Sequence, residues 1–469
     1  MLVFDTPDAL QDSLALFEAA GPDGKVAVRN PALFRNEVVD GLVWTAVFGK
    51  PAVREAARRA IRDAAASLAI LPASILPLYQ AIGRREVSGF TVPALNLRML
   101  TYDSARAAFR AARAIDARAL IFEIARSEMG YTDQRPAEYA CVVLGAAIKE
   151  SWSGPVFVQG DHYQANPKKF KEDPEKEMKA LEALIAESIP AGFFQIDVDT
   201  STLVDLSRPT LPEQQETNCR MTARLVESIR RHEPKEMPVS IGGEIGEVGK
   251  HNTTPDEFRA YIDGLQNRIG ETPGISKVSI QTGSSHGGVV GPDGSIVRVA
   301  IDFGLIRTVS KIAREEYGNA GTVQHGASTL PAEYFGSFPD HDCVEVHLAT
   351  DFQNTVFDHP SLPLPLKREV ERWVFESPAA DRKPGETDAQ FLYRNRKLAI
   401  GKYKERFWNL PMGTREAIAA SLEKKFAFLF EKLRIAGTRE TVEKRVRPVA
   451  VSAAAAANAG FVRDDEAGD

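Results

Sequence analysis

Short apolar runs alternate with longer amphipathic stretches from about residue 91 to residue 350, and this alternation limits the possible folds most. Each stretch between two runs is long enough for a crossover helix, as parallel strands require. Eight such runs predict an α/β fold, a (β/α)8 TIM barrel, with an open doubly wound sheet as the alternative. The expected strands are 92–97, 119–124, 156–159, 193–198, 239–243, 278–281, 322–324 and 344–348.

Helical patterns flank this region on both sides. Residues 1–88 read as a helical N-terminal extension, because 52–71 is rich in strong helix formers. Residues 89–360 would form the barrel with the active site, and 361–450 would be C-terminal helices packing on it. The last residues, 451–469, are low in complexity, and we expect them to form a flexible tail.

The composition excludes several classes of protein. Of 469 residues, 43% are hydrophobic and 26% charged, which is typical of a globular chain rather than a disordered one. A net charge of −6 gives no support for a nucleic-acid partner. The N-terminal stretch is acidic and lacks the basic start of a secretory signal, and no stretch of 18 uncharged apolar residues predicts a membrane span. The three cysteines form no CxxC pair, so we expect free thiols and a cytoplasmic location.

Three of the eight histidines directly follow separate predicted strands: His162, His286 and His325. The active site of a TIM barrel lies at the carboxyl ends of its strands, so these three side chains would share one rim. Three imidazoles with an open fourth position are typical of a catalytic zinc site, and imidazole suits zinc better than magnesium. Taken singly, each histidine is more often a turn or capping residue, and only their joint placement favours a metal site.

Acidic residues fall at the same rim. Asp161 precedes His162, Asp199 ends the fourth strand, and Glu244 and Glu247 follow the fifth. Solvated loop carboxylates are the alternative interpretation of the glutamates. The eighth strand carries two further polar residues, His347 and Asp351.

The motifs TVPALNL, GDH, IDVDTST, GGEIGEVG, GSSHGG and QHGAST occur in this order over roughly residues 90–353. Together they resemble the class II, zinc-dependent ketose-bisphosphate aldolases, such as fructose-bisphosphate and tagatose-bisphosphate aldolases. The resemblance implies a TIM barrel, a divalent metal ion and a homodimer or homotetramer. It implies one catalytic Zn²⁺, with a second divalent or monovalent cation left open.

The resemblance also implies a role for each motif residue. The metal ligands would be His162, His286 and His325, with Asp199 and Glu244 as further carboxylates of the metal site. Asp161 would be the catalytic acid, and Glu247 the nearest candidate for a base on a mobile loop. The implied substrate-binding residues are Asn96, Gly287, Gly326 and Ser328, to which we add His347 and Asp351 of the eighth strand, with a packing role as the alternative for His347.

The sequence departs from the family pattern in the eighth strand, where His347 replaces an asparagine and Ala349 an aspartate. These departures spare the metal residues and change the substrate-binding residues. We therefore expect a lyase that reversibly cleaves a phosphorylated ketose, similar to fructose 1,6-bisphosphate, into dihydroxyacetone phosphate and an aldehyde. Two alternatives stay open. One is a non-catalytic partner subunit of a tagatose-bisphosphate aldolase complex, which the stretch FEIARSEMGYT resembles. The other is a zinc hydrolase on the same barrel.

Overall fold

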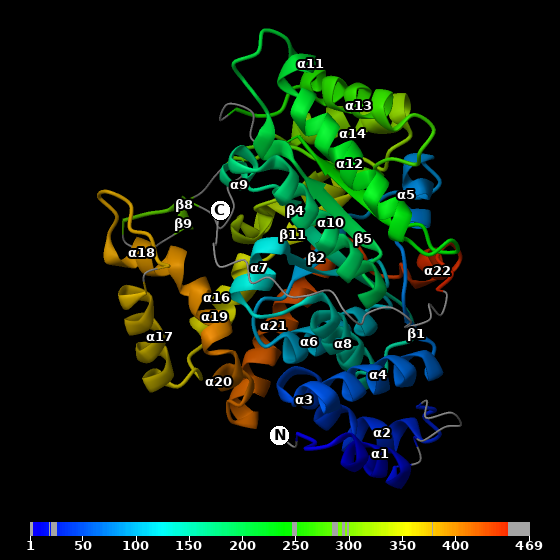
Figure 1. Ribbon diagram of the computed structural model, residues 1–469, viewed down its shortest axis with the longest axis vertical. Coiled ribbons are helices and arrows are strands. Elements are labelled where there is room, and N and C mark those ends of the chain that lie inside the picture. Colours follow the sequence, from blue (N-terminus) through cyan, green and yellow to red (C-terminus); the bar gives the residue numbers. More distant parts are fainter. Residues whose placement is uncertain are drawn as a thin grey trace.

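Eight parallel strands close into a barrel in the computed structural model, which describes residues 3–17, 19, 26–245, 251–283, 289–292, 296–297, 300–377 and 379–448 (Figure 1). Consecutive strands are neighbours, and the last strand pairs with the first, so the sheet has no open edge. This closure confirms the predicted TIM barrel and excludes the open sheet. The strands are β2 (Val92–Asn96), β3 (Ile121–Ala125), β4 (Gly154–Gln164), β5 (Gln195–Asp199), β6 (Ser240–Glu244), β7 (Lys277–Ser279), β10 (Thr322–Gln324) and β11 (Glu345–Leu348).

Amphipathic helices follow the strands and cover the barrel. Local signals fix where several of them begin, as where Asp173 accepts a hydrogen bond from the backbone of Lys176, and where Thr254 and Glu257 form a reciprocal capping box. The main covering helices are α6 (Thr101–Ala114), α8 (Pro136–Lys149), α10 (Pro174–Ala191), α12 (Glu216–His232), α13 (Pro255–Ile269) and α14 (Phe303–Tyr317). Shorter elements are α7 (Arg126–Tyr131), α9 (Pro167–Glu172), α11 (Leu211–Gln214), α15 (Ser337–Asp340), α16 (Thr350–Phe357), and the hairpin β8 (Val289–Val290) and β9 (Ile296–Val297).

The N-terminal extension is helical, and its first four helices gather at one end of the molecule, at the bottom of Figure 1, whereas the fifth lies higher, at the right of the view. It comprises α1 (Pro7–Leu16), α2 (Pro31–Glu37), α3 (Val39–Phe48), α4 (Pro51–Ser67) and α5 (Leu76–Gly83), and α3 and α4 pack against α8.

One detail of the predicted extension is wrong. The helix expected over 52–71 ends at Ser67, because Ala69 adopts a left-handed backbone (φ 57°). Ile70–Pro72 then forms a strand, β1, which pairs in parallel with the start of β4.

The C-terminal region is also helical, with α17 (Leu364–Glu376), α18 (Asp388–Asn395), α19 (Ala399–Lys402), α20 (Lys404–Trp408), α21 (Met412–Lys432) and α22 (Arg439–Glu443). Helix α21 packs on α6, where Arg415 and Asp103 form a buried ion pair at 3.1 Å. The two flanking regions also meet, since the Trp44 indole N–H donates to Asn409 Oδ1 at 3.1 Å. No helix among the described residues is long and apolar enough to cross a membrane. The predicted flexible tail, 451–469, lies outside the described residues.

Replacing Gly145 by alanine tests how the extension docks on the barrel. A Cβ at this buried position of α8 would lie 2.3 Å from Val43 Cγ2 of α3. We expect Gly145→Ala to lower the free energy of unfolding by roughly 1–3 kcal/mol, as overpacking of a core does, measured by urea denaturation. The matched control is Gly413→Ala in α21, where a Cβ would meet nothing within 4 Å. Equal stabilities of the two variants would contradict the described packing of α3 on α8.

Candidate functional site

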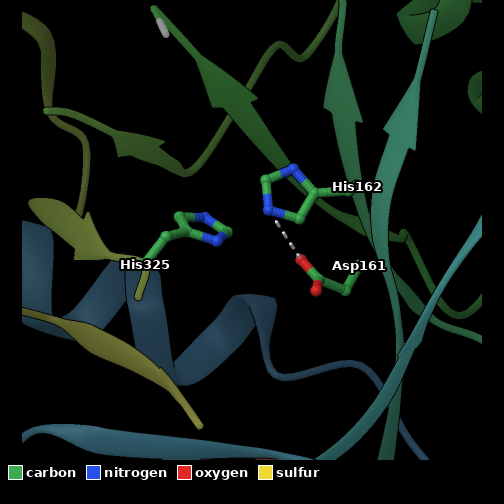
Figure 2. A group of neighbouring side chains, drawn as sticks. All are labelled: Asp161, His162 and His325. Carbon is green, nitrogen blue, oxygen red and sulfur yellow. Dashed lines mark ion pairs between the residues drawn. The ribbon is translucent and has the colours of Figure 1, made fainter. Parts of the chain in front are cut away.

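Five of the predicted site residues meet at the carboxyl ends of β4, β5, β6 and β10. We call them the outer group: Asp161, His162, Asp199, Glu244 and His325. Donor atoms of Asp161, His162 and His325 lie within 4.8 Å of one another, as do those of His162, Asp199 and Glu244. Figure 2 shows Asp161 and His162 extending from one strand, with the His325 ring beside them. Parallel strands of a closed barrel end at one rim, and this brings residues far apart in sequence together.

A bulge in β4 lets two consecutive residues serve the same site. Neighbouring side chains of a regular strand point to opposite faces, so Asp161 and His162 could not both reach one site. The pairing of β4 with β5 shifts register between Gly160 and Tyr163, and His162 adopts a left-handed backbone with φ 41°. Such a conformation is costly for a residue with a side chain, and residues held in it concentrate at functional sites.

The His162 ring is oriented by carboxylates on both of its nitrogens. Nδ1 lies 3.1 Å from Asp199 Oδ2 and 3.1 Å from Glu244 Oε2, and Nε2 lies 3.8 Å from Asp161 Oδ1. Asp199 is itself held, because it accepts hydrogen bonds from Gln164 Nε2 and Ser201 Oγ at 2.6 Å each. A carboxylate on one imidazole nitrogen fixes the ring so that the other can bind a cation.

The imidazoles of the site lie side by side. The His325 ring centroid is 4.3 Å from that of His162 and 4.1 Å from that of His347. On the far side, Ser279 Oγ lies 2.7 Å from His325 Nε2. His347 therefore lies next to His325, one of the predicted metal ligands, although its own predicted role is substrate binding.

Burial and close charges displace the pKa values of the outer group. Burial opposes a charge on His162, but the negative charges of Asp161 and Glu244 outweigh it and raise the pKa of His162 well above its usual value. Burial and the nearby charge of Asp199 raise the pKa of Glu244 to about 7. Burial also opposes ionisation of Asp199, but hydrogen bonds from His162, Ser201 and Gln164 lower its pKa. The group thus holds protons that a bound cation would displace.

The donors of the outer group fit a divalent transition-metal ion. The group's imidazole nitrogens and carboxylate oxygens lie within 4.8 Å of one another in sets of three. These are the ligand types of catalytic zinc sites. The residues that would hold the ion are His162 and His325, with Asp161 or the Asp199–Glu244 pair supplying oxygens. His286, the third predicted histidine, lies outside the described residues.

A second group of charged side chains lies further inside the barrel, and sequence reasoning missed most of it. We call Glu123, Asp161, Asp197, Glu345 and His347 the inner group; Asp161 belongs to both groups. Glu345 and Glu123 are fully buried, and Lys277 lies beside them, also with no exposed surface. The Lys277 ammonium pairs with Glu345 and with Asp197 Oδ2, the latter at 2.9 Å, and donates to Gln159 Oε1 at 2.9 Å.

A signal in the sequence could have revealed this group. Glu123, Gln159, Asp197 and Glu345 lie inside apolar runs that were interpreted only as buried strands. Charged residues are almost never fully buried unless they are paired. Glu345 and His347, like Asp197 and Asp199, are two positions apart and so face the same side of their strand. Charges at these positions in neighbouring strands therefore predict an ionic layer inside the barrel.

The remaining predicted residues lie elsewhere on the rim or outside the described chain. Asn96 donates to Glu128, which also pairs with Arg98. Asp351, at the start of α16, pairs with Lys425 of α21. Two predicted substrate residues follow β10 directly: Gly326 in a left-handed conformation (φ 67°) and Ser328 in a short 3-10 turn. Three predicted site residues lie outside the described residues: Glu247, His286 and Gly287.

Comparison with known proteins agrees with the fold. The profile of the family described as "Fructose-bisphosphate aldolase class-II" matches residues 79–429. A solved structure named as a probable tagatose 6 phosphate kinase from Sinorhizobium meliloti 1021 is 16% identical with a TM-score of 0.50, covering 76% of this chain and 93% of its own.

Two further structures are similar at lower scores. One is fructuronate-tagaturonate epimerase UxaE from Cohnella laeviribosi (13% identity, TM-score 0.49, covering 74% and 82%). The other is fructose-bisphosphate aldolase from Campylobacter jejuni (18% identity, TM-score 0.46, covering 76% and 93%). No curated protein sequence matched significantly. At these identities the structural likeness shows the fold alone.

Binding of Zn²⁺ should depend on pH with a definite sign. Because the pKa of His162 is raised, its ring carries a proton at neutral pH, and Glu244 holds a fractional one. A cation must displace these protons, so we expect release of about one proton per ion near pH 7 and weaker binding as the pH falls. Calorimetric titration of chelator-treated protein in two buffers of different ionisation enthalpy measures this. Identical affinities at pH 6 and pH 8 would contradict the described electrostatics.

Replacing Lys277 tests the buried ionic layer. In Lys277→Met, the buried carboxylates of Asp197 and Glu345 lose their ammonium partner. Removing one member of a buried ion pair costs about 3–5 kcal/mol, and we expect a loss of this size in urea denaturation. The control is Lys425→Met, whose partly exposed pair with Asp351 should contribute only about 0–1 kcal/mol. A Lys277 variant as stable as the control would be incompatible with this layer.

Proposed function

The chain belongs to the class II fructose-bisphosphate aldolase family, and on this premise we propose that it is a cation-dependent lyase that cleaves a phosphorylated ketose reversibly. The products would be dihydroxyacetone phosphate and an aldehyde, as from a substrate similar to fructose 1,6-bisphosphate. One observation carries the proposal: Asp161, His162 and His325 bring a carboxylate and two imidazoles within 4.8 Å at the catalytic rim. This combines a cation site with an acid–base group.

We assign the cation to His162 and His325 and take Zn²⁺ as its identity, because imidazole suits zinc. When bound there, a divalent cation acts as a Lewis acid on the substrate carbonyl and favours the negative charge that develops when the carbon–carbon bond breaks. The chain's own contribution is orientation. Asp199 and Glu244 fix the His162 ring through Nδ1, and Ser279 fixes His325.

Asp161 is the residue we assign to proton transfer. In the cleavage direction its carboxylate takes the proton from the hydroxyl at the breaking bond, while the bond's electron pair stays with the dihydroxyacetone phosphate half. In the condensation direction the same proton returns to the aldehyde oxygen. Asp161 is 5% exposed, and His347 Nδ1 lies 3.1 Å from its Oδ1, so the carboxylate is held in a drier environment than bulk solvent. Glu247 stays the predicted base for the carbon proton.

Substrate oxygens would be bound beside the metal residues. Gly326 follows β10 in a left-handed conformation that exposes backbone amides, and such turns bind phosphate oxygens. Ser328 adds a hydroxyl two residues later. Asn96 is 1% exposed, and its Oδ1 has no hydrogen-bond partner among the described residues, which leaves an acceptor for a substrate hydroxyl. Gly287, His347 and Asp351 complete the proposed substrate residues.

We also propose the oligomeric state, the partners and the compartment of the enzyme. We propose a homodimer or homotetramer, on the strength of the family resemblance, with a small phosphorylated sugar as substrate and no nucleic acid or membrane as partner. The net charge of −6 supports the exclusion of nucleic acid. The buried free thiols of Cys141, Cys219 and Cys343 support a reducing compartment, for which we propose the cytoplasm.

The test is release of triose phosphate from fructose 1,6-bisphosphate by protein of known zinc content, with and without chelator. We expect release that chelator abolishes and Zn²⁺ restores. Asp161→Asn should keep the bound ion and lower kcat by about 10²–10⁴-fold, the usual share of a general acid–base group. The control is Asp358→Asn, which removes a half-exposed carboxylate paired with Arg396 and should leave kcat unchanged.

Other outcomes select the alternatives. Release from other phosphorylated or acidic ketoses but not from fructose 1,6-bisphosphate would keep the lyase and change its substrate. Cleavage of an ester or amide instead would indicate the zinc hydrolase. No turnover by zinc-loaded protein, with activation of a separate aldolase chain, would indicate the non-catalytic partner subunit and refute the proposed activity.

A further inference from the structure

The inner group has the chemistry of a second cation site, separate from the outer group. Donor atoms of Glu123, Glu345 and His347 lie within 4.8 Å of one another, and so do those of Asp161, Asp197 and His347. All five residues are buried. Asp197 and Glu123 lie two residues before the ends of their strands, and Glu345 lies three residues before the end of β11, so they are roughly 6–10 Å deeper than the rim. His347 is common to both sets.

His347 is oriented as a cation ligand would be. Its Nε2 lies 2.6 Å from Glu345 Oε1, and Glu345 is held in turn by Lys277, Tyr79 and Gln159. A carboxylate that accepts the N–H of one imidazole nitrogen leaves the other nitrogen able to bind a metal. That other nitrogen, Nδ1, faces two carboxylates at 3.1 Å each, Glu123 Oε2 and Asp161 Oδ1.

Two carboxylate oxygens of the group lack hydrogen bonds. Glu123 has no exposed surface and Asp197 is 6% exposed, yet Glu123 Oε1 and Asp197 Oδ1 have no hydrogen-bond partner among the described residues. Buried polar atoms are normally satisfied, so two unsatisfied anionic oxygens around one imidazole indicate a missing ligand. Gly242 makes room for one of them, because a Cβ there would lie 2.2 Å from Asp197 Oδ1.

The net charge of the inner group also favours a bound cation. The group contains four carboxylates, and three bases contact it: Lys277, His347 and, at the rim, His162, whose Nε2 lies 3.8 Å from Asp161 Oδ1. The carboxylates outnumber the bases, and uncompensated negative charge in a buried space is costly. A divalent cation would offset it.

From these observations we propose that the inner group binds a second divalent cation, with His347, through Nδ1, and Glu123 as ligands and Asp161 at the boundary with the outer site. Carboxylates with one imidazole suit Mn²⁺ or Zn²⁺. This second ion does not require the lyase activity. It would place a fixed positive charge beneath Asp161, on the side away from the rim.

The experiment counts ions. Chelator-treated full-length protein is dialysed against Zn²⁺ alone or Mn²⁺ alone, and bound metal per chain is measured by plasma mass spectrometry. We expect two ions in the wild-type chain and one in Glu123→Gln, with at least ~100-fold weaker binding at the inner site, since loss of even an outer partner of a ligand costs roughly 10–100-fold. His325→Ala should also bind one ion, and the double variant none.

A matched control separates loss of the site from loss of the fold. Glu138 is a buried glutamate paired with Lys404 at 2.6 Å, outside both groups, so Glu138→Gln should bind two ions. Circular dichroism and thermal unfolding of each variant show whether it is folded. The wild-type count needs no variant, so it tests the inference even if Glu123→Gln does not fold.

Each outcome decides one site. Two ions in folded Glu123→Gln would overturn the inner site, and saturation of the wild-type chain at one ion leaves the variants to identify which site that ion occupies. If one ion is bound and only His325→Ala removes it, the outer site stands and the inner site is refuted. If only Glu123→Gln removes it, the inner site stands and the cation site of the proposed function is wrong. Two ions without turnover would refute the lyase and keep both sites.

Discussion

One ammonium group inside the barrel, that of Lys277, holds together the layer on which the site rests. It compensates Glu345 and Asp197, two carboxylates that would otherwise be buried close to each other without a countercharge. Glu345 in turn fixes His347, and His347 contacts Asp161 at the rim. The position of the proposed acid–base carboxylate therefore depends on a chain of charged contacts that begins two strand positions deeper. A barrel filled with aliphatic side chains could not transmit this constraint.

The bulge in β4 is the second constraint, because it determines which side chains of β4 contact the ionic layer. Without the register shift after Gly160, either Asp161 or His162 would point out of the barrel into the helical shell. With it, His162 reaches the carboxylates of β5 and β6, while Asp161 reaches His347 on β11. A local backbone irregularity thus connects strands on both sides of β4 into one site. The left-handed conformation of His162 is the conformational cost of that connection.

The sequence predicts the barrel well because strand alternation, helix periodicity and crossover length all require the same topology. The eight apolar runs coincide with the eight strands, and His162 and His325 converge at one rim because parallel strands end there. Local patterns could not show β1, whose three residues form a strand only through pairing with β4. Nor could they show that His347 lies against Asp161 inside the barrel, since this depends on Asp161 from β4 and on Lys277 from β7, which holds Glu345. The polar residues within apolar runs, such as Glu123, were the signal for that layer.

The buried ionic layer is not the filling that would make the barrel most stable. Well-packed hydrophobic residues in place of a buried ion network are often neutral or stabilising by about 1–4 kcal/mol, and barrels are ordinarily filled with branched aliphatic side chains. Stability alone therefore does not account for three carboxylates, those of Glu123, Asp197 and Glu345, beneath the rim. A chain that concentrates negative charge there gains a strong field at Asp161 and His325, and this field is of use only if positive charge is held or protons are moved nearby. The ionic layer and the proposed cations are in this sense parts of one electrostatic arrangement, with Lys277 as its permanent cation.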